Sequence, residues 1–448
     1  MEFDHLQEAC EFVAQAARAR GCEQFEVLGT RQLDQELSVY QSRLNKSSYA
    51  ESQALGMRVF VDGRPGYAWS ARLGSEALLE SLAHAMANAA LADPLDLEMP
   101  DRLDVDDLDL ELWSPDWEDW DFARMSSLAL EAAELARQSD RRIVNVPLSA
   151  CQKSSRASYF INSRGVSFEK KSGSVVATCG VTARQKDITK SGYYSQAGRG
   201  PLCLQADTLG QNAVERALEL LDIAPVPSLS AIPVVLSHRV SGRLFALYQS
   251  MFFAEQVQKN QSRLAGRMGE SIAVSELSLR SMARVPGWPA SRLVDSEGMA
   301  TQDIPLVEGG CLQNWLYHLE SAARDGCASN GAATRSLAGV VSTCFANLVV
   351  DRGPHTLEQL LHTWPQCLYV LKLEGAAACS AVSGEISIGA QGWFMVDGQK
   401  VHAFDGLTLS MNFLDLLQNI ALISNEWSPQ WSLARVPDLA IQGFAISQ

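Results

Sequence analysis

The chain has 448 residues, of which 47% are hydrophobic and 20% charged, and its formal net charge at pH 7 is −15. This composition is typical of a globular protein with two or three domains and excludes intrinsic disorder, collagen and coiled coils, while the acidic balance disfavours a nucleic-acid partner. No apolar run is long enough to span a membrane, and the start lacks the basic and apolar regions of a secretory signal, so we expect a cytoplasmic protein with no membrane partner.

The first 90 residues predict a helix, several strands and a second helix, which together make one α+β unit. Apolar residues recur at helical spacing over residues 4–20 and again from Ser75 to near Pro94. Among the turn signals between them, Asp62-Gly63 indicates a hairpin, because glycine supplies the positive φ of a tight turn. The predicted strands cover residues 25–30, 37–42, 55–61 and 67–69.

An unusually acidic segment, residues 101–121, follows this unit. It holds ten acidic residues against Arg102 alone, and tryptophans interrupt it at positions 113, 117 and 120. We interpret it as a solvated crossing loop with aromatic anchors, in preference to a cation site or a partner-docking strip. Calcium is not expected, because the segment lacks the glycine and glutamate of an EF-hand loop.

A second set of elements leads to a predicted domain boundary. Helices are expected near residues 122–137 and 208–221, and Asn162-Ser163-Arg164-Gly165 is expected to form a turn. The strands between these helices are predicted at 143–149, 156–162, 166–171 and 174–184. Prolines 225 and 227 then interrupt regular structure. The boundary gives an N-terminal domain of residues 1–224 and a C-terminal domain of residues 228–448.

The second domain is predicted to be mostly β-structure. Two helices are expected, near residues 241–254 and 409–422, and no internal repeat is detected. Strands are expected at 232–236, 306–310, 348–350 and 368–373, with a hairpin at 393–400. The expected fold class is α+β, with an N-terminal α/β-sandwich-like domain and a C-terminal domain formed by a curved, mostly antiparallel β-sheet, barrel-like, with helices laid on it.

Generic catalytic motifs are absent from the sequence. There is no phosphate-binding glycine loop, nucleophile elbow or H-E-x-x-H segment, and the seven histidines are too dispersed to form a local metal pair. The ten cysteines show no C-x-x-C spacing and are expected to be buried free thiols. Asp295 and Glu297 are close in sequence, a pattern that more often indicates a turn than an acid/base pair.

Seven short segments, in order, resemble the TldD/PmbA family. Most contain glycines at turns and strand ends, and together they extend over nearly the whole chain. They cover residues 51–64, 162–165, 295–298, 305–310, 329–335, 347–348 and 383–394. The resemblance implies metal-dependent peptide hydrolysis, for which the TldD branch of the family carries zinc on an H-E-x-x-x-H segment and a cysteine near the C-terminus.

The segment of this chain that matches the zinc motif departs from it at two positions. His238 is retained, but Arg239 stands at the position of the water-activating glutamate and Arg243 at that of the second histidine, and no cysteine follows Cys379. An arginine has five donors and no acceptor, so it cannot bind a divalent cation. We therefore expect no metal on this degenerate motif, which consists of His238, Arg239, Gly242 and Arg243.

The chain therefore resembles the TldE branch, whose members accompany TldD in a heteromeric protease and bring no metal. This resemblance implies no catalytic residue and no cofactor in this chain, with zinc in a TldD-like partner subunit. The candidate residues lining the substrate site or the subunit interface are His238, Arg239, Arg243 and Arg335. Two roles are open for the arginines, and in the first Arg239, Arg243 and Arg335 form a cationic wall that holds peptide carboxylates or backbone carbonyls. The alternative is that the arginines form ordinary salt bridges across the subunit interface.

The resemblance also implies unstructured peptide substrates, such as leader segments of ribosomally made peptides or small unfolded proteins. An extended peptide can add a strand to a sheet edge, because backbone hydrogen bonds then supply most of the affinity. The expected function is a non-catalytic subunit of a heterodimer or larger TldD/TldE assembly that cleaves such peptides. Two alternatives are a homodimeric peptide-binding protein without protease activity, and an enzyme that uses a distant cysteine or another metal site.

Overall fold

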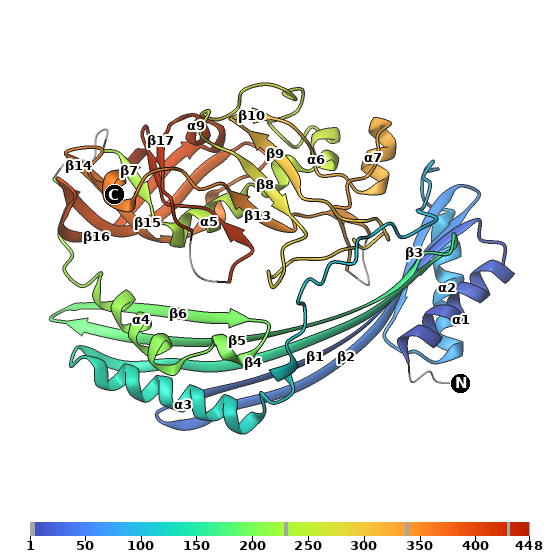
Figure 1. Cartoon of the computed structure of the whole chain (residues 1–448), viewed down its shortest axis with the longest axis horizontal. Helices are drawn as coiled ribbons and strands as arrows, with labels where there is room; N and C mark the ends of the chain where they lie inside the picture. The colour runs from blue at the N-terminus through green and yellow to red at the C-terminus, as the bar shows by residue number, and fades with distance from the viewer. Residues whose placement is uncertain (1–4, 228–231, 337–339, 428–430, 448) are drawn as a thin grey trace.

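The N-terminal half forms a long curved sheet, and the C-terminal half lies over its concave face (Figure 1). The computed structural model describes residues 5–227, 232–336, 340–427 and 431–447. Residue 4, where the first predicted helix begins, and residue 228, where the second predicted domain begins, lie outside these ranges. None of the helices in the described ranges has the length and hydropathy that a bilayer crossing requires.

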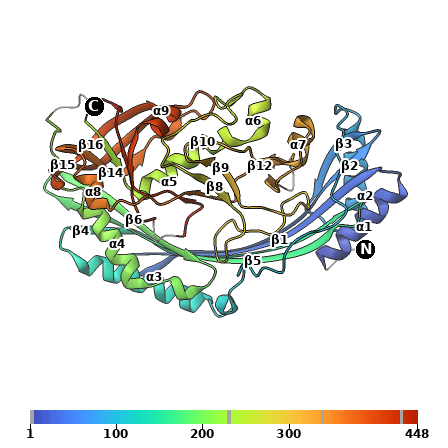
Figure 2. The ribbon, with the colours of Figure 1, turned by 45° about the horizontal axis from the view of Figure 1, so that its top comes forward.

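The N-terminal sheet has six antiparallel strands in the order β3-β2-β1-β4-β5-β6. The strands are β1 (Gln24–Tyr40), β2 (Arg43–Val61), β3 (Arg64–Ser70), β4 (Ile143–Asn162), β5 (Ser167–Gln185) and β6 (Ile188–Gly198). Four helices pack on the outer face, α1 (Leu6–Ala19) and α2 (Ser75–Ala89) at one end and α3 (Phe122–Ser139) and α4 (Ala206–Leu218) at the other (Figure 1). Figure 2 shows the long strands β1 and β5 passing beneath the C-terminal half.

Successive side chains along each strand point to opposite faces of this sheet. In β1, Phe25 and Val27 belong to the core under α1 and α2, whereas Glu26 turns to the opposite face and contacts residues of the C-terminal half. This alternation follows from the period of two in a pleated strand. The inner face of the sheet is therefore the surface on which the C-terminal half rests.

The N-terminal half consists of two units with the same order of elements. The first unit is α1-β1-β2-β3-α2 and the second is α3-β4-β5-β6-α4, and the two are joined by antiparallel pairing of β1 with β4. This repeat was not predicted from the sequence, because the order of elements can repeat where the side chains do not.

Several strands are longer than predicted. The predicted strands 25–30 and 37–42 form the single strand β1, and the four predicted between 143 and 184 form the two strands β4 and β5. Residues 43–50 were not predicted at all, because this exposed part of β2 lacks the apolar alternation of a half-buried strand. Its register with β1 is nevertheless continuous, since ladder hydrogen bonds come from the backbone.

The C-terminal half contains a seven-stranded, a five-stranded and a two-stranded sheet. The seven-stranded sheet consists, in spatial order, of β17 (Ile420–Ile423), β19 (Leu439–Ile441), β7 (Val234–Leu236), β14 (Gln366–Glu374), β15 (Glu385–Val396), β16 (Gln399–Asn412) and β20 (Ala445–Ser447). The five-stranded sheet consists of β10 (Cys311–Leu312), β9 (Ile304–Glu308), β8 (Leu279–Met282), β13 (Asn347–Val350) and β18 (Ala434–Arg435). The short sheet pairs β11 (Ala333–Thr334) with β12 (Ser342–Thr343).

A large hydrophobic core joins the strands of the C-terminal half to its short helices. These helices are α5 (His238–Leu247), α6 (Ala254–Gln258), α7 (Leu319–Asp325), α8 (Leu357–Leu361) and α9 (Phe413–Gln418). The α+β class with a curved, mostly antiparallel sheet is confirmed, and within the described strands only β7–β14 and β13–β18 pair in parallel. The helix predicted at 409–422 was wrong at both ends, because residues 409–412 continue β16 and residues 420–422 belong to β17.

The acidic segment 101–121 runs as an extended crossing connection, as predicted. Its one short helical turn is Pro115–Trp117, and Trp117 and Trp120 are buried in the core under α3 and α4. The Nζ of Lys171 lies 3.6 Å from the centroid of the Trp113 ring. The aromatic anchors thus hold a segment whose carboxylates are mostly exposed.

Candidate functional site

Helix α5 carries the degenerate metal motif and begins directly after a buried strand. Its first residue is His238, and its N-cap is Ser237. The preceding strand β7 lies between β19 and β14 and is wholly buried. The start of α5 is therefore fixed by the interior of the seven-stranded sheet.

His238 is held by a single buried carboxylate, that of Asp438. The backbone N–H of His238 donates to Oδ1 of Asp438 at 3.0 Å, and its ring Nδ1 lies 3.3 Å from Oδ2. Tyr369 and Ser424 also donate to Asp438 through their hydroxyls, at 3.3 and 3.2 Å. Burial acts to raise the pKa of Asp438, but the contacts from His238 and Ser424 outweigh it and hold the pKa below its ordinary value.

Arg239 joins the two halves of the molecule. Its Nη1 donates to Oε1 of Glu219, the C-cap residue of α4, at 2.7 Å. The backbone oxygen of the same glutamate accepts from Trp393 Nε1 and from Lys400 Nζ. Burial raises the pKa of Glu219, although the nearby Arg239 opposes this rise. The Arg239 guanidinium is thus engaged with a residue of its own chain.

Gly242 and Arg243 have separate partners. A Cβ at Gly242 would lie 2.8 Å from the backbone oxygen of Ala434, so glycine allows α5 to pack closely against β18. Arg243 is exposed, and its Nη1 donates to the backbone oxygen of Leu373 in β14 at 3.0 Å.

These residues do not fit a zinc ion. A catalytic zinc site needs three protein ligands and one open position. Here His238 and Asp438 are the nearby side chains that could bind a metal, and both oxygens of Asp438 already accept hydrogen bonds. Arg239 and Arg243 supply only positive charge. In the described part of the chain, no three His, Cys, Asp or Glu side chains are grouped so as to hold a metal ion.

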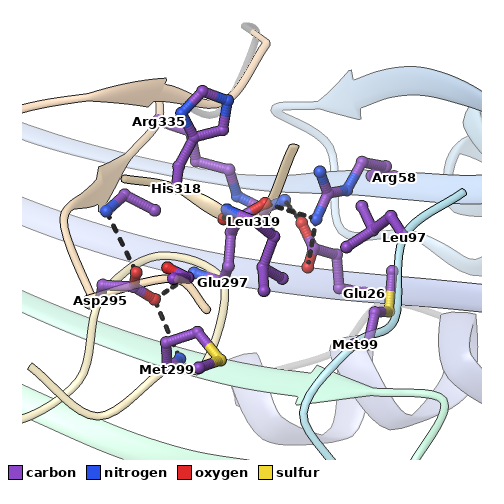
Figure 3. A network of polar contacts seen from close by, with 12 residues as sticks. Glu26, Arg58, Leu97, Met99, Asp295, Glu297, Met299, His318, Leu319 and Arg335 are labelled. Carbon is purple, nitrogen blue, oxygen red and sulfur yellow. Dashed lines mark hydrogen bonds and ion pairs between the residues drawn. The ribbon is translucent and has the colours of Figure 1, made fainter. Parts of the chain in front are cut away.

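Arg335 lies in a different place, a buried ion network between the two halves (Figure 3). Its Nη1 donates to Oε1 of Glu26 at 2.6 Å, and Nη2 of Arg58 lies 3.0 Å from Oε2 of the same glutamate. The same Arg58 nitrogen donates to Oε1 of Glu297 at 2.8 Å, and Oε2 of Glu297 accepts from the backbone N–H of Leu319 at 2.7 Å. The side chains of Glu26, Arg58 and Glu297 have no exposed surface.

The network contains two arginines and two glutamates, so its charges balance, but removing these charges from water costs free energy. Burial opposes the charge of Arg58, yet Glu26 and Glu297 outweigh it and raise the arginine pKa well above its ordinary value. The pKa of Glu297 is raised by burial, against which Arg58 acts. Beside the network, Leu97, Met99 and Leu319 form an apolar cluster with Phe60 and exclude water. Such ion pairs are strong only while every partner is present.

Asp295 and His318 complete this region with structural roles. Asp295 accepts from the backbone N–H groups of Glu297 and Met299, so the interpretation of the 295–298 segment as a turn is confirmed. His318 caps α7, and its Nδ1 lies 3.0 Å from Thr343 Oγ1. Burial lowers the pKa of His318, which favours the neutral ring.

The structure therefore groups His238, Arg239 and Arg243 on α5 and places Arg335 in a separate network. Glu26 and Arg58 were not predicted as site residues, although a charged residue inside an apolar strand is a signal that the sequence contains. The substrate-lining or interface-lining role of His238, Arg239, Arg243 and Arg335 stays a prediction.

Three family models match consecutive parts of the chain. PmbA/TldA metallopeptidase domain 1 matches residues 25–89, the PmbA/TldA metallopeptidase central domain matches residues 115–221, and the PmbA/TldA metallopeptidase C-terminal domain matches residues 230–448. The first two lie in the predicted N-terminal domain and the third in the C-terminal half.

The chain is also similar to individual bacterial and archaeal proteins. It is 24% identical over 425 residues to the metalloprotease PmbA homolog of Haemophilus influenzae, which covers 94% of this chain and 91% of that one. It is 26% identical over 377 residues to metalloprotease PmbA of Escherichia coli O157:H7, with 83% and 81% covered. The crystal structure of TldE from Thermococcus kodakarensis superposes with a TM-score of 0.84 at 20% identity, covering 98% of this chain and 100% of that one. At this identity, the last likeness concerns the fold.

Proposed function

The chain belongs to the PmbA/TldA metallopeptidase family, and on this premise we propose that it is a TldE-like subunit without catalytic residues of its own. In this proposal it pairs in the cytoplasm with a TldD-like zinc protease subunit, and the assembly cleaves unfolded peptides. This chain supplies part of the wall and the interface, and the partner supplies the metal.

The observation that carries this proposal is the chemistry of α5. The position of the water-activating glutamate holds Arg239, which is bonded to Glu219, and the position of the second imidazole holds Arg243, which is bonded to Leu373. Guanidinium groups cannot replace metal ligands or a general base. A peptidase that includes this chain would therefore need a metal centre from another polypeptide.

Assembly with a partner tests the proposal directly. The chain is co-expressed with a family member from the same genome that has an intact H-E-x-x-x-H segment, and the complex is sized by light scattering. We expect a stable complex that hydrolyses an unstructured peptide, with zinc retained by the partner after the subunits are separated. One zinc ion held by the isolated chain, together with chelator-sensitive hydrolysis by it, would contradict the proposal. A homodimer that binds peptide and ignores the partner would support the alternative function.

A second experiment separates the structural and substrate-lining roles of the α5 arginines. Because Arg239 and Arg243 are bonded within the chain, we expect Arg239→Ala/Arg243→Ala to lower the free energy of unfolding by about 1–2 kcal/mol, since the Arg239 pair is partly exposed. We expect hydrolysis by the assembled complex to change by less than about twofold, which is about 0.4 kcal/mol. The control is Arg137→Ala/Arg324→Ala, which removes two exposed ion pairs. A KM at least about tenfold higher with unchanged stability would instead assign the arginines to a cationic wall.

A further inference from the structure

A cavity of about 260 Å³ lies where the inner face of the N-terminal sheet meets the C-terminal half. Its floor comes from β1, β4 and β5, and its opposite wall comes from residues 292–296 and the start of β11. The cavity lies beside the buried ion network, since Arg335 belongs to both. It is separate from the α5 segment, none of whose cations lines it.

Four cationic side chains line this cavity in a chain whose net charge is −15. They are Arg156 on β4, Lys170 on β5, Arg292 in the opposite wall and Arg335. In the ranges that the structure describes, no carboxylate forms an ion pair with Arg156, Lys170 or Arg292, although the chain has 52 acidic residues. Without a carboxylate partner in those ranges, these three cations give the cavity a local excess of positive charge.

Hydrogen-bond donors of the lining residues are also left without partners. Nη2 of Arg335 and the hydroxyl of Thr30 are buried without a partner among the described residues, and these two side chains are nine-tenths or more buried. The same holds for Nε of Arg292 and Oγ of Ser296 at the opposite wall. Buried polar atoms in proteins are nearly always satisfied, so four around one cavity indicate a missing acceptor.

The one acidic residue in the lining does not supply that acceptor. Asp295 accepts from three backbone N–H groups, those of Glu297, Met299 and Ala333. Its oxygens therefore hold the chain in place and leave the cationic donors free. The pKa of Lys170 is lowered to about 8, first by burial and then by repulsion from the positive charges of Arg292, Arg156 and Arg199.

We propose that this cavity is a binding site for a small oxyanion with two negative charges, of the phosphate or dicarboxylate type. Its oxygens would accept from Arg335 Nη2, Arg292 Nε and the hydroxyls of Thr30 and Ser296, and its charge would neutralise Lys170 and Arg156. Charge-assisted hydrogen bonds of this kind are about twice as strong as those between neutral groups. Because the donors come from both halves of the molecule, the bound anion links them. This site does not depend on the proposed partner subunit.

Calorimetric titration of the full chain with sulfate, inorganic phosphate and succinate tests the site. We expect at least one probe to bind, with sulfate or phosphate favoured by a tetrahedral site and succinate by a dicarboxylate site. Lys170→Met and Arg292→Gln should each weaken binding by at least about tenfold. The control Lys46→Met removes the same charge from an exposed position on β2 and should leave affinity unchanged. No binding of any probe at millimolar concentration, or equal binding by Lys170→Met and the native chain, would overturn the proposal.

Thermal unfolding provides a second readout that a merely structural role would not produce. A lysine whose pKa is lower in the folded than in the unfolded chain destabilises the fold while it is charged, and this cost is relieved as pH rises through about 8. Lys170→Met should therefore unfold at the same temperature as the native chain or higher without anion, and anion should no longer raise it. A lower unfolding temperature that sulfate still raises would contradict the site.

The pH dependence of binding has a predicted sign. Of the groups that face Lys170, Arg156, Arg199 and Arg292 stay charged. Burial and then the charge of Glu297 raise the pKa of Asp295, which lines the same cavity, to about 7, so this carboxyl loses its proton at lower pH than Lys170 does. Sulfate keeps both charges, so its affinity for the native chain should fall as pH rises through about 8, where Lys170 loses its proton, beyond any fall near pH 7 that the ionisation of Asp295 causes. Lys170→Met should lose the fall near pH 8 and keep only the part that Asp295 causes.

Discussion

Replacing Arg58 by methionine is expected to lower the free energy of unfolding by about 3–5 kcal/mol. The arginine is fully buried and is the charge that separates Glu26 from Glu297. Methionine fills much of the same space, but two buried carboxylates then face each other with only Arg335 beside them. Denaturant unfolding followed by circular dichroism measures the loss.

A paired substitution makes this prediction specific to charge balance. In Arg58→Met/Glu297→Gln, the remaining pair of Glu26 and Arg335 is neutral, and a glutamine oxygen can still accept from the Leu319 backbone. We therefore expect the double variant to be more stable than Arg58→Met alone. The control Arg137→Met breaks an exposed pair with Glu134 and should cost less than about 1 kcal/mol. Additive losses in the double variant would show that the packing of Arg58, and not its charge, stabilises the interface.

The loss in Arg58→Met should also depend on pH. Burial already raises the pKa of Glu297, and removing Arg58 takes away the main opposing charge. A carboxyl whose pKa is higher in the folded chain destabilises the fold above that pKa, and the penalty disappears as the group is protonated. The stability difference between native chain and variant should therefore shrink as pH falls from about 8 to about 5. A difference that is constant over this range would contradict the prediction, because it would show that Glu297 does not change its protonation state in the variant between about pH 8 and about pH 5.

The network illustrates which part of a site a single sequence can reveal. Arg58 and Glu26 can be recognised as unusual, because charged residues inside apolar strand patterns are seldom fully buried unless paired. Glu297, the second carboxylate that pairs with Arg58, lies 239 positions from it, and no local pattern predicts that contact. Arg335 was grouped with the α5 cations because it shares their charge, whereas the fold places it with Glu26. The residue types suggested what chemistry the side chains could do, but only the fold determines which side chains lie next to each other.

The same limit applies to the fold. Helices α1 to α4 and the turn at 162–165 were predictable because each depends on local spacing or turn chemistry. The full lengths of β1, β2, β4 and β5 were not, since their polar stretches are stabilised by pairing along the sheet. The role of α5 could be described only by combining the sequence with the structure. The sequence indicated that metal ligands were lost, and the structure shows which partners the replacing arginines have.

The two-unit organisation of the N-terminal half leads to the second large effect. The edge strands β3 and β6 occupy equivalent places, and each has a glycine beneath a helix of its own unit. A Cβ at Gly66 would lie 2.6 Å from the backbone nitrogen of Ala89 in α2 and would overlap the oxygen of Ala85. At Gly192, a Cβ would overlap backbone atoms of Ala213 and Ala217 in α4. These glycines let helix backbone lie directly on strand backbone at both ends of the sheet.

Gly66→Ala and Gly192→Ala should therefore each destabilise the fold by about 2–3 kcal/mol, since backbone atoms cannot move aside as a flexible side chain would. Thr189→Ala, an exposed position on the same edge strand as Gly192, is the matched control and should change stability by less than about 0.5 kcal/mol. Thermal unfolding of the three variants measures these differences. Because the two glycines have equivalent places in the two units, similar losses are expected, and a neutral result at either position would mean that its helix can shift outward without losing its core contacts.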